Sequence, residues 1–510
     1  MHKLAAPLAG AFAATGFAPL ELWPLALAAL AVLMGLIAQA ETMRSALLTG
    51  WLFGVGHFAV GNNWIAGAFE HQDAMPHWLG WIAVVLLALY LAIYPAVAAG
   101  LAWRWGRPRT WVFVLMFAAA WIVTEYLRAV LFTGFAWNPL GVLWLPTGLV
   151  RTAPYVGTYG LSGIAVLASG VLMSLAGAVR SRSVVQSSAP IAALLVMGVL
   201  ASWPLPRAVP ATGPVVRVVQ PNIGLNEGRD IAVAREGLAK LARLSGVPGP
   251  EPRLLFWPEA ALNDAYEIAY DPRLRDDLAA LLGPEDLLVT GGTRIEYRKR
   301  IGVGGLEAVA VGATNSVFAL DATGAIRLRY DKAHLVPYGE YLPARPLLSA
   351  IGLARLVPGD LDFWPGPGPL SASLGAAGKI GVQICYEIIF SGQVVDRRDR
   401  PDFIFNPSND AWFGTWGPPQ HLAQARLRAI EEGLPVIRST PTGISAVIDA
   451  RGQIAVAIPL GKAGFIQTRM PAAAAPTPFA RAGNLLPLGL AALLAGIAIA
   501  LSQRNRYGHT

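Results

Sequence analysis

The uneven distribution of charged residues constrains the fold of this chain more than any single motif does. Charged residues are sparse before Pro204, frequent from Arg217 to Arg469, and nearly absent from Gly483 to Leu501. They make up 14% of the 510 residues, whereas soluble domains contain about 25%. Much of the chain is therefore expected to lie in lipid. The pattern predicts a seven-helix membrane region (1–203), a large soluble domain (204–483), and a final membrane helix with a short tail (484–510).

Eight apolar runs are candidate membrane-spanning helices, since a span takes about 20 apolar residues. The first run is short, and a cleavable signal peptide is its alternative. However, only Lys3 precedes it as a basic residue, and it continues directly into another apolar segment, which favours a retained helix. The predicted spans are Leu4–Phe17, Leu22–Ala38, Ala46–Ile65, Trp78–Trp103, Trp111–Leu131, Tyr159–Val179, Ala189–Trp203 and Leu485–Leu501.

The Lys and Arg residues in the connections between these runs predict the orientation. With a cytoplasmic N-terminus, that side holds nine basic residues and the opposite side only Arg128 and Arg151. The soluble domain is therefore expected outside the cytoplasm and both termini inside. The net charge of +8 then reflects this bias and requires no nucleic acid as a partner. The nine residues are Lys3, Arg44, Arg104, Arg107, Arg109, Arg180, Arg182, Arg504 and Arg506.

From Val215 onward, short β-forming runs alternate with helical ones, which is typical of an α/β domain. The stretch Arg294–Gly312, with its glycines and four basic residues, is expected to be an exposed mobile loop. Helices are expected at Ile231–Leu244, Pro272–Leu282 and Pro419–Glu432. Strands are expected at Val215–Gln220, Arg253–Trp257, Leu287–Thr290, Asn315–Leu320, Ala325–Tyr330, Phe403–Asn406, Val436–Ser439, Ile444–Asp449, Ile454–Ile458 and Phe465–Arg469.

The only cysteine, Cys385, is predicted to end a short apolar strand that begins at Lys379, and Glu387 follows two residues later. Strand ends in α/β folds are where reactive side chains meet a ligand. A single unpaired cysteine in an oxidising compartment is also a candidate reactive thiol. The alternative is a buried structural cysteine, which is common for this residue type.

Two charged residues at other strand ends or loops could activate such a thiol. Glu259 follows Trp257 and Pro258, which would desolvate its carboxylate and increase its basicity. Lys332 is a fixed cation that could stabilise a thiolate and a developing oxyanion, while Glu259 takes the thiol proton. The alternatives are a helix cap for Glu259 and a surface charge for Lys332.

The motifs around these residues resemble the nitrilase, or carbon–nitrogen hydrolase, superfamily. They are Trp257-Pro258-Glu259, Lys332-x-x-Leu335-Val336-Pro337-Tyr338-Gly339-Glu340 and Cys385-Tyr386-Glu387. Together with the membrane helices, further motifs narrow the resemblance to the apolipoprotein N-acyltransferase family. These are Ser408-Asn409-Asp410-Ala411-Trp412-Phe413-Gly414, Gly16-Phe17-Ala18-Pro19, Gly61-Asn62-Asn63-Trp64 and Tyr159-Gly160-Leu161-Ser162.

This resemblance implies an α-β-β-α sandwich with a catalytic triad of Glu259, Lys332 and Cys385, and neither metal nor cofactor. The supporting or substrate-binding residues that it implies are Glu340, Tyr386, Glu387 and Trp412. It further implies a monomer that works from the periplasmic side of the bacterial inner membrane.

The reaction that the resemblance implies is a ping-pong acyl transfer. An acyl chain would pass from a phospholipid to Cys385 as a thioester, and then to the α-amino group of a diacylglyceryl-cysteine at the N-terminus of an apolipoprotein. Two departures lie outside the triad: Leu225-Asn226-Glu227-Gly228 replaces a segment where many members have tryptophan, and Thr440-Pro441-Thr442-Gly443 has proline where Asn-Thr-Gly is common.

Two other functions were weighed against this one. A membrane-anchored nitrilase-type amidase would use the same triad with water as the acceptor. A transporter or receptor should show charges within the membrane, and only Glu125 and Arg128, near one helix end, come close. The apolar loops Leu342–Leu356 and Ala411–Trp416 are candidate lipid-facing mouths of the site, with ordinary packing as the alternative.

Overall fold

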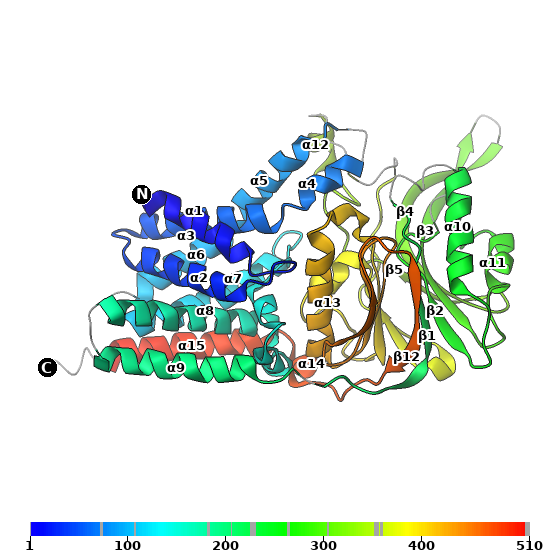
Figure 1. Cartoon of the computed structure of the whole chain (residues 1–510). Coiled ribbons are helices and arrows are strands. Elements are labelled where there is room, and N and C mark those ends of the chain that lie inside the picture. The colour runs from blue at the N-terminus through cyan, green and yellow to red at the C-terminus, as the bar shows by residue number, and fades with distance from the viewer. Residues whose placement is uncertain are drawn as a thin grey trace.

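The computed structural model of the chain consists of a helical region and a two-sheet region that pack against each other (Figure 1). The structure describes residues 2–71, 75–106, 109–180, 184–205, 207–224, 231–262, 266–302, 305–350, 356 and 361–504. The final helix returns from the sheets to lie among the N-terminal helices. The start of the first helix and the end of the last one both lie on the side away from the sheets.

All eight predicted apolar runs are helical over most of their length. The run Trp78–Trp103 is divided at Ala92 into two helices, and a short additional helix, α4, follows the third run. The helices of this region are α1 (His2–Ala14), α2 (Trp23–Ala38), α3 (Met43–Gly61), α4 (Ile65–Ala68), α5 (Leu79–Leu91), α6 (Ile93–Gly106), α7 (Thr110–Val130), α8 (Ala153–Arg180), α9 (Val184–Ser202) and α15 (Leu485–Arg504).

Four stretches of the described chain are long and apolar enough to cross a membrane: Leu79–Gly106, Thr110–Val130, Gly148–Val179 and Leu485–Gln503. Eight spans are therefore not confirmed. Three of the other predicted spans form shorter apolar helices at Leu4–Ala14, Trp23–Ala38 and Ile191–Ser202. The remaining one, α3, contains four glycines as well as Arg44 and His57.

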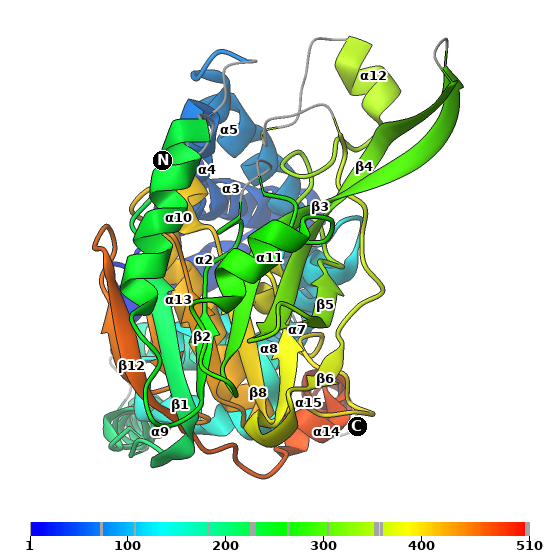
Figure 2. The same cartoon turned by 90° about the vertical axis from the view of Figure 1, so that its right-hand side faces the viewer.

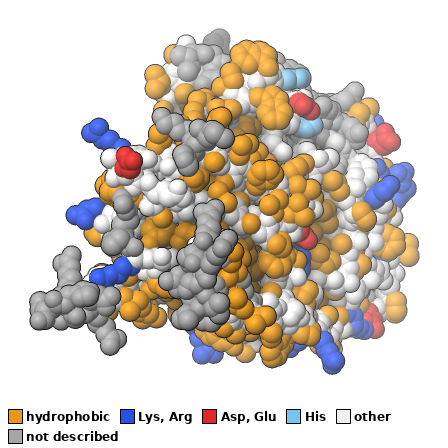
Figure 3. Space-filling model, turned by 60° about the vertical axis from the view of Figure 1, so that its left-hand side comes forward, with side chains coloured by type: hydrophobic (Ala, Val, Ile, Leu, Met, Phe, Trp, Pro, Cys, Tyr) orange, Lys and Arg blue, Asp and Glu red, His pale blue; other side chains and the backbone are white. Residues whose placement is uncertain are grey.

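The outer surface of the helical region is apolar. Large hydrophobic side chains such as Trp81, Leu86, Leu195 and Leu493 are more than half exposed there. Hydrophobic side chains cover much of this face in Figure 3, and the few charged ones lie mainly at its margins. Such an extended apolar surface is what a protein presents to lipid rather than to water.

From Gly134 onward, most of the connection between α7 and α8 is buried instead of exposed. It contains two short 3₁₀ helices, η2 (Leu140–Trp144) and η3 (Gly148–Thr152). Trp137 and Trp144 are among the largest fully buried side chains of the described chain. This segment packs between the helical region and the sheets, which the sequence pattern did not indicate.

The second region contains two six-stranded sheets, with strand orders β12-β1-β2-β3-β4-β5 and β11-β10-β9-β8-β7-β6. The strands of the first sheet are β1 (Ala211–Gln220), β2 (Arg253–Phe256), β3 (Leu287–Gly302), β4 (Gly305–Asp321), β5 (Ile326–Asp331) and β12 (Gly464–Pro471). Those of the second are β6 (Ser371–Ser373), β7 (Lys379–Val382), β8 (Phe403–Pro407), β9 (Val436–Ser439), β10 (Ser445–Ile448) and β11 (Ile454–Ile458).

Successive side chains along the strands of the first sheet point to opposite faces, so each face of this sheet contributes to a separate hydrophobic core. Leu254 and Phe256 face the second sheet, where Phe256 packs on Phe405 with ring centroids 4.7 Å apart. Their neighbours Leu255 and Trp257 face the other way. That outer face is covered by α10 (Ile231–Ser245) and α11 (Pro272–Ala279), and α13 (Gly417–Glu432) covers the second sheet on the side of the helical region (Figure 1). The layers follow the order α-β-β-α, as the resemblance implied.

The prediction of a mobile loop at Arg294–Gly312 was wrong. Most of this stretch extends β3 and β4 into a long hairpin, paired from Leu287↔Asp321 to Gly302↔Gly305. The hairpin projects beyond the sheet toward the top of Figure 2, the side on which the short helix α12 (Arg345–Ala350) also lies. A two-stranded ribbon that leaves the core has no buried face, so it lacks the apolar alternation by which strands are recognised in a sequence. The short elements β6 and α14 (Pro478–Ala482) were also not predicted.

Candidate active site

Glu259, Lys332 and Cys385 come from the ends of strands in both sheets, and the packing of the two sheets brings them together. Glu259 lies just beyond β2, Lys332 follows β5, and Cys385 lies just beyond β7. Lys332 Nζ lies 3.6 Å from Glu259 Oε1. All three residues are buried, with at most 7% of their surface exposed. The charges of Glu259 and Lys332 are close enough to change the pKa of the Cys385 thiol.

The backbone at Cys385 is in the left-handed region, with φ of 50°. A residue other than glycine adopts this conformation at a cost of about 1–3 kcal/mol, so the surrounding structure must hold it. The chain passes there directly from strand β7 into the 3₁₀ helix η6 (Cys385–Ile389). Glu387 Oε2 accepts a hydrogen bond from Ile384 N at 2.7 Å, and the Cys385 carbonyl lies 3.0 Å from His421 Nε2. These contacts on both sides of Cys385 stabilise the turn.

Both oxygens of the Glu259 carboxylate accept hydrogen bonds. Its Oε1 accepts from Asn315 Nδ2 at 2.8 Å, and its Oε2 accepts from Asn409 N at 2.6 Å. Burial raises the pKa of Glu259 above its usual value; Lys332 opposes this shift, and the nearby Glu340 carboxylate adds to it. A carboxylate with a raised pKa is a stronger base, as a general base for a thiol requires.

Lys332 is held in place by Glu340. Lys332 Nζ donates to Glu340 Oε1 at 2.9 Å, and Asn315 Nδ2 donates to the same oxygen at 2.8 Å. The second oxygen of Glu340 accepts from Val336 N at 2.8 Å. Burial alone would lower the pKa of Lys332, but the carboxylates of Glu340 and Glu259 outweigh it and raise that pKa. Lys332 is therefore a permanent positive charge beside the thiol.

The thiol itself is protonated at rest. Burial, together with the negative charge of Glu259, raises the pKa of Cys385 well above its usual value, although Lys332 and a hydrogen bond from Asn409 N act in the opposite direction. A nucleophile with a raised pKa reacts only if a base removes its proton during the attack. Glu259 is the candidate base in this arrangement.

Glu387 links the turn of Cys385 to the segment of Lys332. Its Oε1 accepts from Tyr330 Oη at 2.9 Å, from Ala333 N at 2.7 Å and from His334 N at 3.1 Å. Burial raises the pKa of Glu387 to about 7, although the backbone donors His334 N, Ile384 N and Ala333 N and the charge of Lys332 oppose the shift. The implied supporting role of Glu387 thus has a structural counterpart in the relative placement of two site segments.

Tyr386 and Trp412 face the helical region. Tyr386 Oη donates to the Gly134 carbonyl, at 3.1 Å, in the segment that follows α7. Trp412 is half-buried and makes an edge contact with His71, with ring centroids 5.9 Å apart. Both residues therefore lie where the two regions meet, and Tyr386 directly follows Cys385 in the chain.

Several residues of this site were missed by the sequence analysis. Asn315 and Asn409 bond the Glu259 carboxylate, and a buried cluster of Asp410, His421 and Arg438 lies beneath Cys385. Asn409 and Asp410 lie within the motif Ser408–Gly414, so that motif could have indicated that they belong to the site. Nothing local distinguishes Asn315, His421 or Arg438, because their partners are remote in the chain.

The two departures from the family pattern have different outcomes. Residues 225–228 lie outside the described residues. The Pro441 carbonyl accepts a hydrogen bond from Asn222 N at 2.7 Å, so this loop is tied to the end of β1. Of the candidate lipid-facing loop Leu342–Leu356, residues 342–350 and 356 are described, and Leu347 on α12 is largely exposed.

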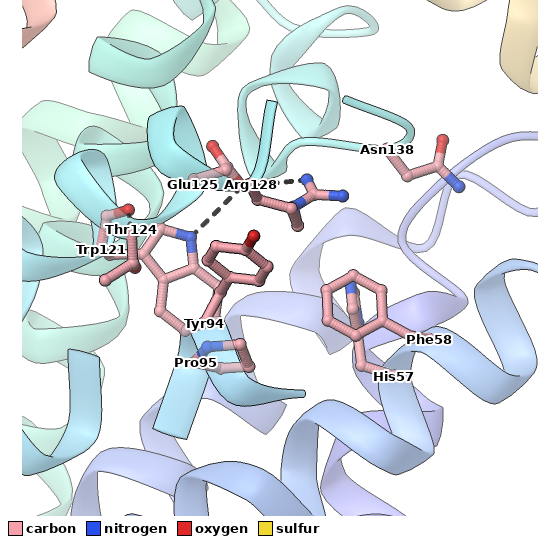
Figure 4. A pocket seen from close by; sticks show the side chains of 9 residues that line it. All are labelled: His57, Phe58, Tyr94, Pro95, Trp121, Thr124, Glu125, Arg128 and Asn138. Atoms are coloured by element: carbon pink, nitrogen blue, oxygen red, sulfur yellow. Dashed lines mark hydrogen bonds and ion pairs between the residues drawn. The ribbon is translucent and has the colours of Figure 1, made fainter. Parts of the chain in front are cut away.

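A cavity of about 10 Å³ lies in the helical region, apart from the site, and its volume is close to the minimum for one water molecule. Figure 4 shows Glu125 within it, bonded to Trp121 and paired with Arg128 one helical turn away. The full lining is His57, Phe58, Tyr94, Pro95, Trp121, Thr124, Glu125, Arg128 and Asn138. Among the described residues, no group of three or more His, Cys, Asp or Glu side chains is placed to hold a metal ion.

Comparison with known proteins agrees with this architecture. Residues 239–478 match the family model described as carbon-nitrogen hydrolase, and residues 9–171 match the apolipoprotein N-acyltransferase N-terminal domain. A crystal structure of Saccharomyces cerevisiae Nit3, a nitrilase-superfamily member, is 18% identical and covers 52% of this chain and 92% of its own, with a TM-score of 0.35. That score is too low to bear on the fold. By its layers, its strand-end cluster and the family match, the second region is a nitrilase-superfamily domain.

Relatives that span nearly the whole chain identify the family. The apolipoprotein N-acyltransferase of Bradyrhizobium diazoefficiens is 35% identical over 99% of this chain and 95% of its own length. That of Caulobacter vibrioides is 34% identical over 98% of this chain and 94% of its own. The chain belongs to the apolipoprotein N-acyltransferase family, and it is a membrane acyltransferase with a nitrilase-type domain.

Proposed function

We propose that this protein transfers an acyl chain from a phospholipid to the α-amino group of the N-terminal diacylglyceryl-cysteine of apolipoproteins, through a thioester on Cys385. The observation that carries the mechanism is the buried Glu259–Lys332 pair, 3.6 Å apart, whose charges both act on the only thiol of the chain. The family and the names of the relatives support the choice of donor and acceptor.

In the first half-reaction, Glu259 takes the proton of the Cys385 thiol as the sulfur attacks the sn-1 ester carbonyl. Lys332 stabilises the oxyanion of the tetrahedral intermediate. The ester C–O bond then breaks, and the proton passes from Glu259 to the departing oxygen of the lysophospholipid. The product is a thioester between the acyl chain and Cys385.

In the second half-reaction, the lipoprotein amine attacks the thioester carbonyl. Glu259 accepts a proton from the amine, the C–S bond breaks, and the proton returns to the Cys385 sulfur. A thioester suits this step because amines attack it readily, while exclusion of water from a buried site limits hydrolysis. Because the domain packs against the helical region at Tyr386 and Trp412, the acyl chains of both substrates can remain in lipid.

The membrane arrangement is part of the proposal. The proposed topology has eight spans, with the domain of residues 204–483 on the periplasmic side of the bacterial inner membrane and both ends inside. The nine-to-two bias of basic residues supports this orientation, as does the position of the start of α1 and the end of α15 on the side away from the sheets. Alkaline phosphatase fused near Pro248 should be active and the same reporter after Arg504 inactive; the reverse result would overturn the orientation.

Intact-mass analysis after incubation with phospholipid, without an acceptor, tests the chemistry. The protein should gain one fatty-acyl group, neutral hydroxylamine should remove it, and Cys385→Ala should not gain it. A diacylglyceryl-cysteine peptide should then discharge the adduct as an N-acyl product. An adduct that persists in Cys385→Ala would exclude the proposed nucleophile. Discharge to free fatty acid alone would instead favour the amidase-type alternative, in which water is the acceptor.

A further inference from the structure

A cluster of three buried charged or ionisable side chains lies beneath Cys385 and takes no part in the reaction steps above. Asp410 belongs to the 3₁₀ helix η7 (Asp410–Phe413), His421 to α13 and Arg438 to β9, and at most 1% of each is exposed. Arg438 Nη2 donates to both carboxylate oxygens of Asp410, at 2.7 and 2.8 Å. Such a buried pair stays together, because no water is available to solvate either charge if the two separate.

The contacts of His421 determine which of its ring nitrogens carries a proton. Its Nε2 lies 3.0 Å from the Cys385 carbonyl oxygen, which can only accept, so Nε2 is the donor. Its Nδ1 lies 3.1 Å from Arg438 Nη2 and 3.1 Å from Asp410 Oδ1. Burial and the charge of Arg438 lower the pKa of His421. A lowered pKa favours the neutral imidazole, in which Nδ1 shares a hydrogen of Arg438 Nη2 with the Asp410 carboxylate.

Aromatic rings from both regions of the molecule enclose His421. The Trp137 ring, from the segment after α7, lies 5.4 Å from the imidazole, and the Phe413 ring lies 5.6 Å from it. Trp137 is itself fixed, because its Nε1 donates to Gln420 Oε1 at 2.7 Å. These contacts leave the imidazole no room to turn away from the Cys385 carbonyl.

We infer that His421 is a positioning residue for the nucleophile: its Nε2–H holds the Cys385 carbonyl, and so holds the left-handed turn that places the thiol beside Glu259 and Lys332. Asp410 and Arg438 in turn hold the imidazole. This assignment rests on the proposed function only in naming Cys385 as the nucleophile. It explains why a residue other than glycine keeps φ of 50° at the end of β7.

Replacement of His421 by glutamine or asparagine distinguishes a role in positioning Cys385 from a role in packing alone. The side-chain nitrogen of glutamine falls near the place of histidine Nε2, so His421→Gln keeps a donor for the Cys385 carbonyl. The shorter asparagine falls near the place of Nδ1, so His421→Asn keeps the contact with Asp410 and Arg438 but not the one with Cys385. If His421 only stabilised the cluster, asparagine would be the better substitute.

Alkylation of the purified full-length protein with iodoacetamide measures the position of the thiol without any lipid. Because Cys385 is the only cysteine, every adduct reports on it. His421→Asn should alkylate roughly 10- to 100-fold more slowly at neutral pH than wild type, since a misplacement of about 1 Å can cost that much. Its rate should rise only at higher pH, and His421→Gln should stay close to wild type. The groups that act on the thiol in this pH profile are Glu259, Lys332 and Asp410.

A buried histidine of the helical region provides the control variant. His57→Phe removes another buried histidine, one that packs on Phe53 and Phe58 in the helical region, and it should alkylate like wild type. Faster alkylation of His421→Asn at every pH would mean a loosened fold, and equal rates for the two amides would mean no positioning role; either result overturns the inference. If wild type is acylated by phospholipid but His421→Gln and His421→Asn alkylate at equal rates, the inference fails and the proposed function stands. If wild type gains no acyl adduct, the proposed function fails and the inference stands.

Discussion

The two regions of the molecule each bury a pair of opposite charges, and the pairs differ in what surrounds them. Glu125 and Arg128 lie one turn apart on α7, with 6% and 3% of their surfaces exposed and their charged atoms 3.9 Å apart. Glu259 and Lys332 in the nitrilase-type domain are equally buried and 3.6 Å apart. Burial and pairing alone therefore do not distinguish a reactive pair from a structural one.

The hydrogen bonds of the α7 pair are directed to the backbone of the next segment. Arg128 Nη1 donates to the carbonyls of Phe135 and Trp137, at 3.0 and 2.8 Å, and Glu125 Oε1 accepts from Leu140 N at 3.0 Å. This pair therefore shapes the connection that contacts Tyr386. The Glu259–Lys332 pair instead lies beside a thiol whose pKa it changes. What a buried charge faces, not its burial, indicates chemistry.

The largest effect should follow from Glu259→Gln, which keeps the size of the side chain and one of its two acceptor oxygens but removes the base. General-base catalysis contributes roughly 10²–10⁴-fold, so acylation of Cys385 at neutral pH should fall by that factor, and the residual rate should rise with pH as the thiol ionises. Time-resolved intact mass measures it.

Glu125→Gln is the matched change in the helical region. Per molecule of folded protein, its acylation rate should stay within a few-fold of wild type, because the contacts of Glu125 described above are with Arg128, Trp121 and the Leu140 backbone, all outside the site. A large loss of acylation in folded Glu125→Gln, or normal acylation in Glu259→Gln, would contradict the distinction between a structural pair and a reactive one.

Lys332→Met should reduce acylation by roughly 10²–10³-fold, the usual cost of losing one oxyanion donor. Raising the pH should not rescue it, because the defect lies in the transition state as well as in ionisation of the thiol. Lys379→Met, at the start of β7, removes a half-exposed lysine paired with Asp399 and should leave the rate unchanged. Rescue of Lys332→Met at high pH would assign Lys332 to thiolate stabilisation alone.

Arg128→Met should affect stability more than chemistry. Removal of one partner of a buried ion pair typically costs about 3–5 kcal/mol, because the other charge stays uncompensated. The thermal unfolding midpoint in detergent should therefore drop clearly in Arg128→Met. The double variant Glu125→Gln/Arg128→Met should be less destabilised than Arg128→Met, since no lone charge remains. Additive losses would mean that the two residues act independently.

The smallest effect should be a pH dependence of stability due to Glu387. Its pKa is raised to about 7 in the folded protein, against a usual value of 4.5, so its ionisation opposes folding. Its contribution to stability should therefore be lost as the pH rises from about 4.5 through 7. Between pH 5 and 8, the unfolding midpoint of wild type should fall more than that of Glu387→Gln, by on the order of 2–4 °C. Glu236→Gln, on the exposed face of α10, should follow wild type.

The sequence alone predicted the elements whose signals are local. The apolar runs became helices because every residue of such a run carries the signal. Strands such as β2 and β7 were predicted from short apolar runs, and the motifs at their ends indicated Glu259 and Cys385. The packing of two sheets then brought these residues together, as the resemblance to a known family implied.

The tertiary structure alone decided the features that depend on remote partners. Tyr386 bonds Gly134 across 252 positions of the chain, and His421 meets the carbonyl of Cys385 across 36. The outer part of the β3–β4 hairpin leaves the core, so no buried face marks it as a pair of strands in the sequence. Each of these features depends on the free energy of a contact with a distant segment of the chain. The local spacing of residues does not show which distant segment will make that contact.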